Sequence, residues 1–381
     1  MAMPRPVFSS EHEMFRDAFR KFLEGEAVPH NDQWERDGQV SREVWRKAGE
    51  QGFLGCNVPE KFGGLGLDFG YNAIMTEEMC LLGLTGLSIN LHSDVVLPYL
   101  YEYGSQALVE KYMPRLLSGE MITAIAITEP GAGSDVKAIR TTAVRQGDHY
   151  VLNGSKTYIT NGQLCDLVLV VAKTAPDLGA RGISLFFVEA DSPGFRKGRK
   201  LEKLGMKAQD TSELFFDNVE VPVENMIGEE NKGFGYLMHN LGQERLTCAI
   251  GAVAMAQRAV DETVKFVKER IVFGQALSTF QNTQFTLAKM DAEVTQGRVF
   301  ADHCLALFIQ GKLDGTIAAK LKLLSSEMAN RVIDDGLQLH GGAGYMWEYP
   351  IARLYADARI NRIFAGSNEV MKLLISRELL N

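Results

Sequence analysis

Cysteine is scarce in this chain of 381 residues, and no two cysteines form a Cys-x-x-Cys pattern. Wide spacing and an odd number of cysteines argue against a disulfide framework and against a zinc site, and they favour a reducing compartment. The seven histidines are scattered too, and only His340 stands inside a glycine-rich motif. We therefore expect no metal site. The five cysteines are Cys56, Cys80, Cys165, Cys248 and Cys304.

Long hydrophobic runs are also missing. No stretch is apolar over the roughly 20 residues that a membrane helix needs, and the N-terminus lacks the basic start and apolar centre of a secretory signal. We expect a cytoplasmic protein with no membrane partner. The formal net charge of -8 disfavours nucleic acid, because an acidic surface repels phosphate. A hydrophobic content of 46% suffices for two or three packed units, with acyl chains or small molecules as partners.

The spacing of apolar residues changes twice and predicts an α+β fold of three domains. In residues 1–120 apolar residues recur at three and four, and a Ser followed three residues later by an acid marks a helix start. Residues 121–231 consist of short β-rich runs between Gly, Asp, Asn and Pro, which predict a compact antiparallel barrel or sandwich. In residues 232–381 the helical period returns over three long segments and a shorter fourth, which predicts a bundle.

Two segments of the middle region carry polar residues that suit a ligand. In AITEPGAGSD a strand ends at Thr128, and Gly133 and Ser134 follow in a loop whose backbone can approach a ligand closely. In NGSKTYITNG an aromatic ring and a hydroxyl flank Ile159 on a strand and can bracket a planar ring. When each segment is taken alone, a tight turn explains the first better than a ligand site does, and ordinary strand packing explains the second better. A Rossmann fingerprint and a Walker A motif are both absent.

Further motifs follow in the helical C-terminal region. KERIVFGQALSTFQ and QLHGGAGYMWEYP are, alone, typical of helix ends with glycine stops. Together with the middle segments, they resemble the acyl-CoA dehydrogenase family of flavoenzymes from about Phe8 to Leu380. ITEPGAGSD with KTYITNG resembles the first family signature, and the segment from QLHGGAGYMWEYP to ISREL resembles the second. GMKAQDTSELFF and HGGAGYMWEYP are most similar to the long-chain type.

The resemblance implies a helical N-terminal domain, a middle β-domain and a C-terminal four-helix bundle, with FAD between the β-domain and the bundle. It also implies a homotetramer in which a neighbouring subunit completes each FAD site. Among the matching residues, Arg270, Phe273, Gln281, Gln338 and Gly342 match positions that hold the ADP half. The residues predicted to bind FAD are Thr128, Gly133, Ser134, Tyr158, Ile159, Thr160, Arg270, Phe273, Gln281, Gln338, Gly341, Gly342, Ser367 and Glu369.

One position departs from the family pattern. Many members carry the catalytic Glu just after the second signature, where this chain has Ala365. A smaller group, the long-chain and isovaleryl types, carries it on the first bundle helix, and Glu244 in GQERL occupies that position. We therefore predict that Glu244 is the catalytic base. The alternative is an ordinary bundle ion pair between Glu244 and Arg245.

The implied reaction removes the α-proton of an acyl-CoA thioester and transfers the β-hydride to the flavin, which gives trans-2-enoyl-CoA. The base needs a pKa matched to its task. The enolate needs hydrogen bonds at its oxygen, which the backbone N–H of Ala365 can donate without a side chain. The residues predicted to bind substrate are Ser134, Gln243, Arg245 and Ala365.

We therefore expect an FAD-dependent acyl-CoA dehydrogenase of β-oxidation that acts on a medium- to long-chain fatty acyl-CoA. Its electrons would pass to an electron-transfer flavoprotein. A branched-chain or isoprenoid acyl-CoA is the alternative substrate. A non-catalytic flavin- or CoA-binding scaffold is the alternative class, because Ala365 cannot abstract a proton. The presence of Glu244 argues against a scaffold.

Overall fold

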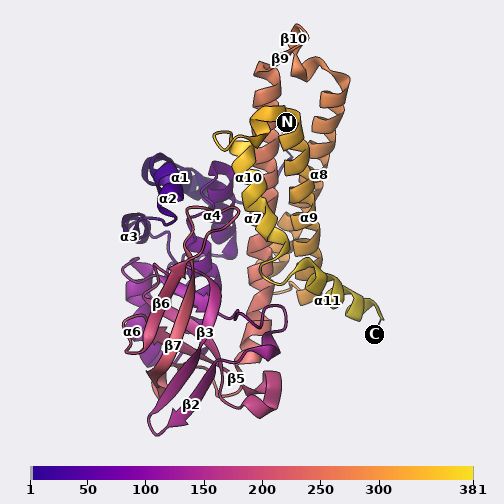
Figure 1. Ribbon diagram of the computed structural model, residues 1–381. Helices are drawn as coiled ribbons and strands as arrows, with labels where there is room; N and C mark the ends of the chain where they lie inside the picture. Colours follow the sequence, from indigo (N-terminus) through magenta and orange to yellow (C-terminus); the bar gives the residue numbers. More distant parts are fainter. Residues whose placement is uncertain (1–2, 381) are drawn as a thin grey trace.

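The computed structural model describes residues 3–380 and follows the predicted order of helices, strands and helices (Figure 1). The first helix begins after Ser9, whose hydroxyl accepts a hydrogen bond from the backbone N–H of His12. The capping box is thus built by Ser9 and His12, one residue earlier than the predicted Ser and acid. The N-terminal helices are α1 (Ser10–Glu26), α2 (Asn31–Asp37), α3 (Arg42–Glu50), α4 (Phe69–Leu82), the π-helix η3 (Leu91–Val96), α5 (Leu97–Tyr103) and α6 (Gln106–Leu117).

The strands of the middle region form one eight-stranded sheet, in which β1 pairs with β4 beside the path β6-β7-β3-β2-β4-β5-β8. Strands β4 and β5 are buried almost throughout, so their side chains make the centre of this core. The sheet is mixed, because β4 runs parallel to β1 and β2, and the predicted purely antiparallel arrangement is wrong in that respect. The strands are β1 (Thr123–Ala126), β2 (Thr142–Gln146), β3 (His149–Thr160), β4 (Leu167–Lys173), β5 (Ile183–Glu189), β6 (Phe195–Lys200), β7 (Thr211–Pro222) and β8 (Met226–Ile227).

The C-terminal region is a bundle of long helices with a small hairpin at one end (Figure 1). Small residues such as Gly251 and Ala252 let α4 and α9 pack closely on α7, and aliphatic side chains fill the core between them. One more helix, α10, lies between the predicted third and fourth helices. The elements are α7 (Gly233–Glu269), the hairpin strands β9 (Ile271–Val272) and β10 (Gln275–Ala276), α8 (Gln281–Ile309), α9 (Gly315–His340), α10 (Pro350–Ala358) and α11 (Asn368–Leu380). Within residues 3–380, no helix is both long enough and apolar enough to cross a membrane.

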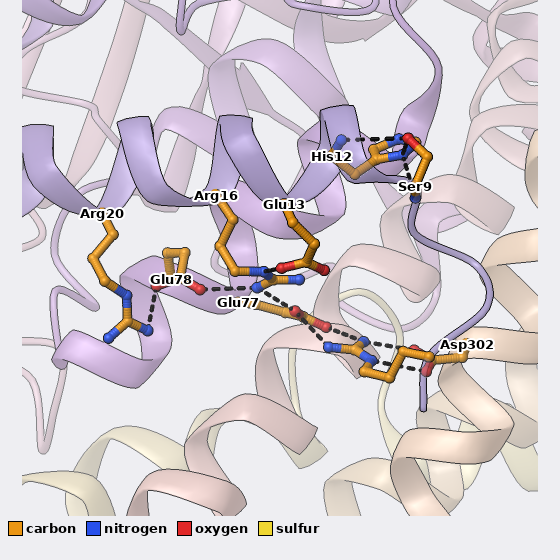
Figure 2. Close-up of polar contacts among 9 residues, drawn as sticks. Ser9, His12, Glu13, Arg16, Arg20, Glu77, Glu78 and Asp302 are labelled. Atoms are coloured by element: carbon orange, nitrogen blue, oxygen red, sulfur yellow. Dashed lines mark hydrogen bonds and ion pairs between the residues drawn. The ribbon is translucent and has the colours of Figure 1, made fainter. Parts of the chain in front are cut away.

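An ion-pair network fastens the N-terminal segment to the rest of the molecule. Arg5 donates to Glu77 of α4 at 2.5 and 2.9 Å and to Asp302 of α8 at 2.6 and 2.9 Å. Figure 2 shows Arg16 of α1 between Glu77 and Glu78, with N–O distances of 2.9 and 2.8 Å. Because these groups are largely buried, the network joins α1, α4 and α8 more firmly than surface pairs would.

Candidate functional site

Helix α7 positions the predicted base. Glu244 lies three turns into this 37-residue helix and is half-buried. The hydroxyl of Tyr99, from α5, donates a hydrogen bond of 3.4 Å to Glu244 Oε1. Burial raises the pKa of Glu244 to about 7, and Tyr99 and the charge of Arg245 oppose part of that rise. A carboxyl with this pKa is a suitable general base at neutral pH.

Polar groups around Glu244 have unused hydrogen-bonding capacity. Arg245 is buried, and it has no carboxylate within 4.0 Å in residues 3–380, so the ordinary ion pair is not formed. In this part of the chain, Arg245 Nε and Asn240 Nδ2 also have no hydrogen-bond partner. The side chain of Gln243 is already engaged, since its Nε2 donates to the carbonyl of Asp94 at 2.6 Å. Unpaired buried donors next to a carboxyl are what a polar ligand would satisfy.

The turn that carries Ala365 is fixed on α9. Ala365 has a φ of 51°, in the left-handed region that residues with a Cβ seldom adopt. Lys322 of α9 donates to the carbonyl of Gly366 and to Asn368 Oδ1, each at 2.9 Å. Ser367 is half-buried in the same turn, and Glu369 is exposed at the start of α11.

A buried ion pair joins the two motifs of the middle region. Lys156 Nζ donates to Glu129 Oε1 at 2.8 Å and to the carbonyls of Ile127 and Val171. The backbone N–H of Thr157 donates to the carbonyl of Thr128 at 2.9 Å. These bonds hold the glycine loop after β1 against the end of β3. Buried paired charges tie the two segments together because separating them leaves an uncompensated charge.

The predicted ligand residues of this region differ in exposure. Tyr158 has a φ of 61° and is 69% exposed, while Ile159 is buried in the sheet, so the Ile159 side chain has no open face for a cofactor. Thr160 is half-buried and donates to Gln209 Oε1 at 3.4 Å. Gly133 and Ser134 are exposed, and a Cβ at Gly133 would meet nothing within 4 Å. The loop is therefore open to an approaching ligand.

The remaining predicted residues lie at the other end of α7. Arg270 follows Glu244 by 26 residues, which at 1.5 Å per residue separates them by about 39 Å. Phe273 is 96% exposed at the tip of the hairpin. His340 stacks on Phe266 at 4.2 Å, which places the beginning of the second signature at this end too. The structure therefore does not bring this group to Glu244 within one chain; it comprises Arg270, Phe273, Gln281, Gln338, Gly341 and Gly342.

Several residues with a part in the site were not predicted from the sequence. Tyr99, Lys322 and Asn240 lie far along the chain from one another, and no local pattern marks them. Glu129 and Lys156 stand inside the quoted motifs, where a charge of each sign between apolar and glycine residues was an available signal.

Comparison with known proteins agrees with this geometry. Family models match over most of the chain: the acyl-CoA dehydrogenase N-terminal domain at residues 9–120, the middle domain at 124–219 and the C-terminal domain at 231–380. The chain is 49% identical to the mouse (Mus musculus) mitochondrial long-chain specific acyl-CoA dehydrogenase, over 99% of this chain and 88% of that protein. It is also 49% identical to the crystal structure of an acyl-CoA dehydrogenase from Geobacillus kaustophilus, with a TM-score of 0.97 over 99% and 100% of the two chains.

A glutaryl-CoA dehydrogenase from Mycobacterium smegmatis in complex with FADH2 is similar as well, with 27% identity and a TM-score of 0.91 over 98% and 95% of the two chains. The chain thus belongs to the acyl-CoA dehydrogenase family. Members of this family bind FAD. The predicted family and fold class are confirmed.

The described residues fit this cofactor. Tyr158 offers an exposed ring next to a glycine loop with open space over Gly133, which suits a planar ring approaching the backbone. Arg270 is exposed beside Phe273, and a guanidinium can neutralise a pyrophosphate. The described residues thus include side chains of the types that the ring and the pyrophosphate of FAD would need.

Proposed function

We propose that this protein is an FAD-dependent dehydrogenase of a fatty acyl-CoA, in which Glu244 removes the α-proton. The observation that carries the proposal is the half-buried carboxyl of Glu244, whose pKa of about 7 lets it accept a proton at neutral pH. Its Oε1 accepts the hydrogen bond of Tyr99, which orients the carboxylate on the helix. A non-catalytic scaffold would have no need for a tuned base at this place.

The other side chains near Glu244 bind and orient the thioester. The backbone N–H of Ala365 stabilises the enolate oxygen, which needs a donor aimed where charge develops. Arg245 and Gln243 flank the base, and the unpaired Arg245 Nε is a donor for the CoA part. Ser134, on the exposed glycine loop, would also contact the thioester. When bound, FAD supplies the oxidant that accepts the β-hydrogen as a hydride.

Residues for the two halves of FAD come from two copies of the chain in this proposal. Thr128, Ser134, Tyr158 and Thr160 would hold the ring, with Ser367 and Glu369 beside it. About 39 Å of helix separates Glu244 from Arg270, so one cofactor cannot meet both ends of the same chain. The group at the hairpin end of α7 would therefore hold the ADP half of a neighbour's FAD. This need for a second copy supports an assembly of at least two chains, and the proposed assembly is a homotetramer.

The substrate proposed is a medium- to long-chain fatty acyl-CoA of β-oxidation, and the proposed electron acceptor is an electron-transfer flavoprotein. The 49% identity to a long-chain specific relative supports the chain length. The test is an anaerobic titration of the purified yellow protein with acyl-CoAs of graded length and branching. Bleaching of the flavin by straight chains of medium to long length is the expected result. Preferential bleaching by branched acyl-CoAs would replace the substrate, and no bleaching by any thioester would refute the dehydrogenase function.

A further inference from the structure

Lys322 is a fully buried cation in the bundle. It lies on α9 between Leu321 and Leu323 and is 1% exposed. Within residues 3–380 no carboxylate lies within 4.0 Å of its ammonium. A buried charge is costly unless hydrogen bonds compensate it. A position that retains such a cation calls for a role other than packing.

The hydrogen bonds of Lys322 all go to one turn. Its ammonium donates to the carbonyl of Gly366 and to Asn368 Oδ1 at 2.9 Å each. Asn368 is held in turn by Ser326 and by Glu327, with its Nδ2 donating to Glu327 Oε1 at 2.8 Å. Three residues of α9 therefore hold the start of α11 through hydrogen bonds. One of these bonds goes to Gly366, the residue directly after Ala365.

The turn needs these hydrogen bonds, because its backbone conformation is unfavourable. Ala365 has a φ of 51° and Gly366 a φ of 87°. For a residue with a Cβ, the left-handed region is unfavourable, because the Cβ lies too close to the following carbonyl oxygen. Gly366 adopts its conformation freely, whereas Ala365 does not. Without an external constraint, the backbone N–H of Ala365 would lose its fixed direction.

Lys322 also faces the part of α7 that carries the base. Helices α7 and α9 pack along each other over much of their length. Cys248 lies one turn after Glu244, and the charges of Lys322 and of Glu244 both act on its thiol, whose pKa burial raises to about 12. Arg245 is a second α7 side chain close enough to act on the Lys322 ammonium. The side chain of Lys322 therefore lies near the segment of α7 that carries Glu244.

We propose that Lys322 is a positioning residue for the reaction: by holding Gly366 and Asn368 it keeps Ala365 in its left-handed conformation, with the N–H of Ala365 directed at the substrate carbonyl. This inference rests on the proposed dehydrogenase function. Lys322 touches neither substrate nor cofactor in this role. It acts through the turn, so its loss should weaken enolate stabilisation more than it weakens FAD binding.

The test measures enolate formation alone. A 3-thiaacyl-CoA has an acidic α-proton but a sulfur at the β-position, so it can lose the proton and cannot deliver a hydride. The bound enolate gives a long-wavelength charge-transfer band with oxidised flavin, and the pH midpoint of that band reports enolate stability. A misplaced donor costs about a hundredfold per ångström, so we expect Lys322→Met to raise the midpoint by about one to two pH units. Lys320→Met, two residues along the same helix and half-buried in the wild type, is the matched control and should leave it unchanged.

A double-mutant cycle with Ala365→Gly separates positioning from general packing. Glycine adopts a positive φ without strain, so the turn then depends less on Lys322. We expect Lys322→Met to shift the midpoint several-fold less in the Ala365→Gly background than alone. Equal shifts in both backgrounds, or no shift by Lys322→Met at all, would overturn the positioning role.

Two further controls make each outcome informative. Thermal unfolding and the FAD dissociation constant are measured for every variant, and the fold-change in FAD affinity is expected to be smaller than the fold-change in enolate stability. If Lys322→Met does not fold, the same cycle is run with Lys322→Gln, which keeps a donor and loses the charge and the reach. Absence of the charge-transfer band in the unmodified protein would instead refute the dehydrogenase function, so the two failures are distinguishable.

Discussion

Replacement of Glu244 by glutamine removes the proposed base and little else. Glutamine keeps the Oε1 atom, so Tyr99 can still donate its hydrogen bond and the fold around α7 is preserved. With a pKa of about 7, Glu244 is about half ionised at pH 7 and largely ionised at pH 8. General-base catalysis contributes about a hundredfold to ten-thousandfold. We expect Glu244→Gln to slow proton removal by that factor at pH 8.

The assay is the single-turnover rate of flavin reduction under anaerobic conditions, with saturating acyl-CoA. Glu244→Gln should stay yellow, bind acyl-CoA and bleach slowly or not at all. Glu262→Gln is the matched control, because Glu262 is also half-buried on α7 and faces Arg258 at 3.7 Å. Its rate should equal that of the unmodified protein. A rate for Glu244→Gln within a few-fold of the unmodified protein would show that Glu244 is only a structural carboxyl of the helix.

Three further predictions concern pH, stability and cofactor binding. The kcat/KM of the unmodified protein should rise with pH to a plateau above about 7, and Tyr99→Phe should shift this rise to higher pH, because the Tyr99 hydrogen bond lowers the pKa of Glu244. A hydrogen bond of about 0.5–1.5 kcal/mol limits the shift to about one pH unit. An unchanged pH profile would exclude the contact. Lys156→Met should lower the free energy of unfolding, measured by urea denaturation, by about 3–5 kcal/mol. The double change Lys156→Met with Glu129→Gln should recover part of this loss. A loss below about 1 kcal/mol for Lys156→Met would contradict a buried ion pair. Arg270→Ala should raise the FAD dissociation constant at least tenfold without changing the pH profile, and an unchanged constant would remove Arg270 from the cofactor site.

Regular patterns made the order of elements predictable. The buried strands β4 and β5 can be recognised in the sequence because their runs of apolar β-branched and aromatic residues are continuous. Strands β2 and β6 have no such run. β6 has the sequence FRKGRK and lies at the edge of the sheet, where charged residues protect an unpaired strand. A charged edge strand has no apolar pattern, so only the neighbouring β7 defines it.

The candidate site was predictable in part. Glu244 could be proposed because it stands at a position of GQERL that the family resemblance picks out. Its hydrogen bond with Tyr99 joins residues 145 positions apart in the sequence, and the hydrogen bond from Lys322 to Asn368 joins residues 46 positions apart. Such contacts depend on how α5, α7 and α9 pack, which apolar spacing does not specify. The buried Lys322 was also unpredictable, because a lysine in an apolar helix usually extends to the surface.

The network around Arg5 has a consequence for synthesis of the chain. Asp302 lies 297 residues after Arg5 in the sequence. At about 5–20 residues per second, this partner is synthesised roughly 15–60 s after Arg5. Until then Arg5 can pair with Glu77, which also accepts from Arg16. The segment around Arg5 therefore reaches all of its native contacts only when α8 has been made, although it precedes α8 in synthesis by most of the chain.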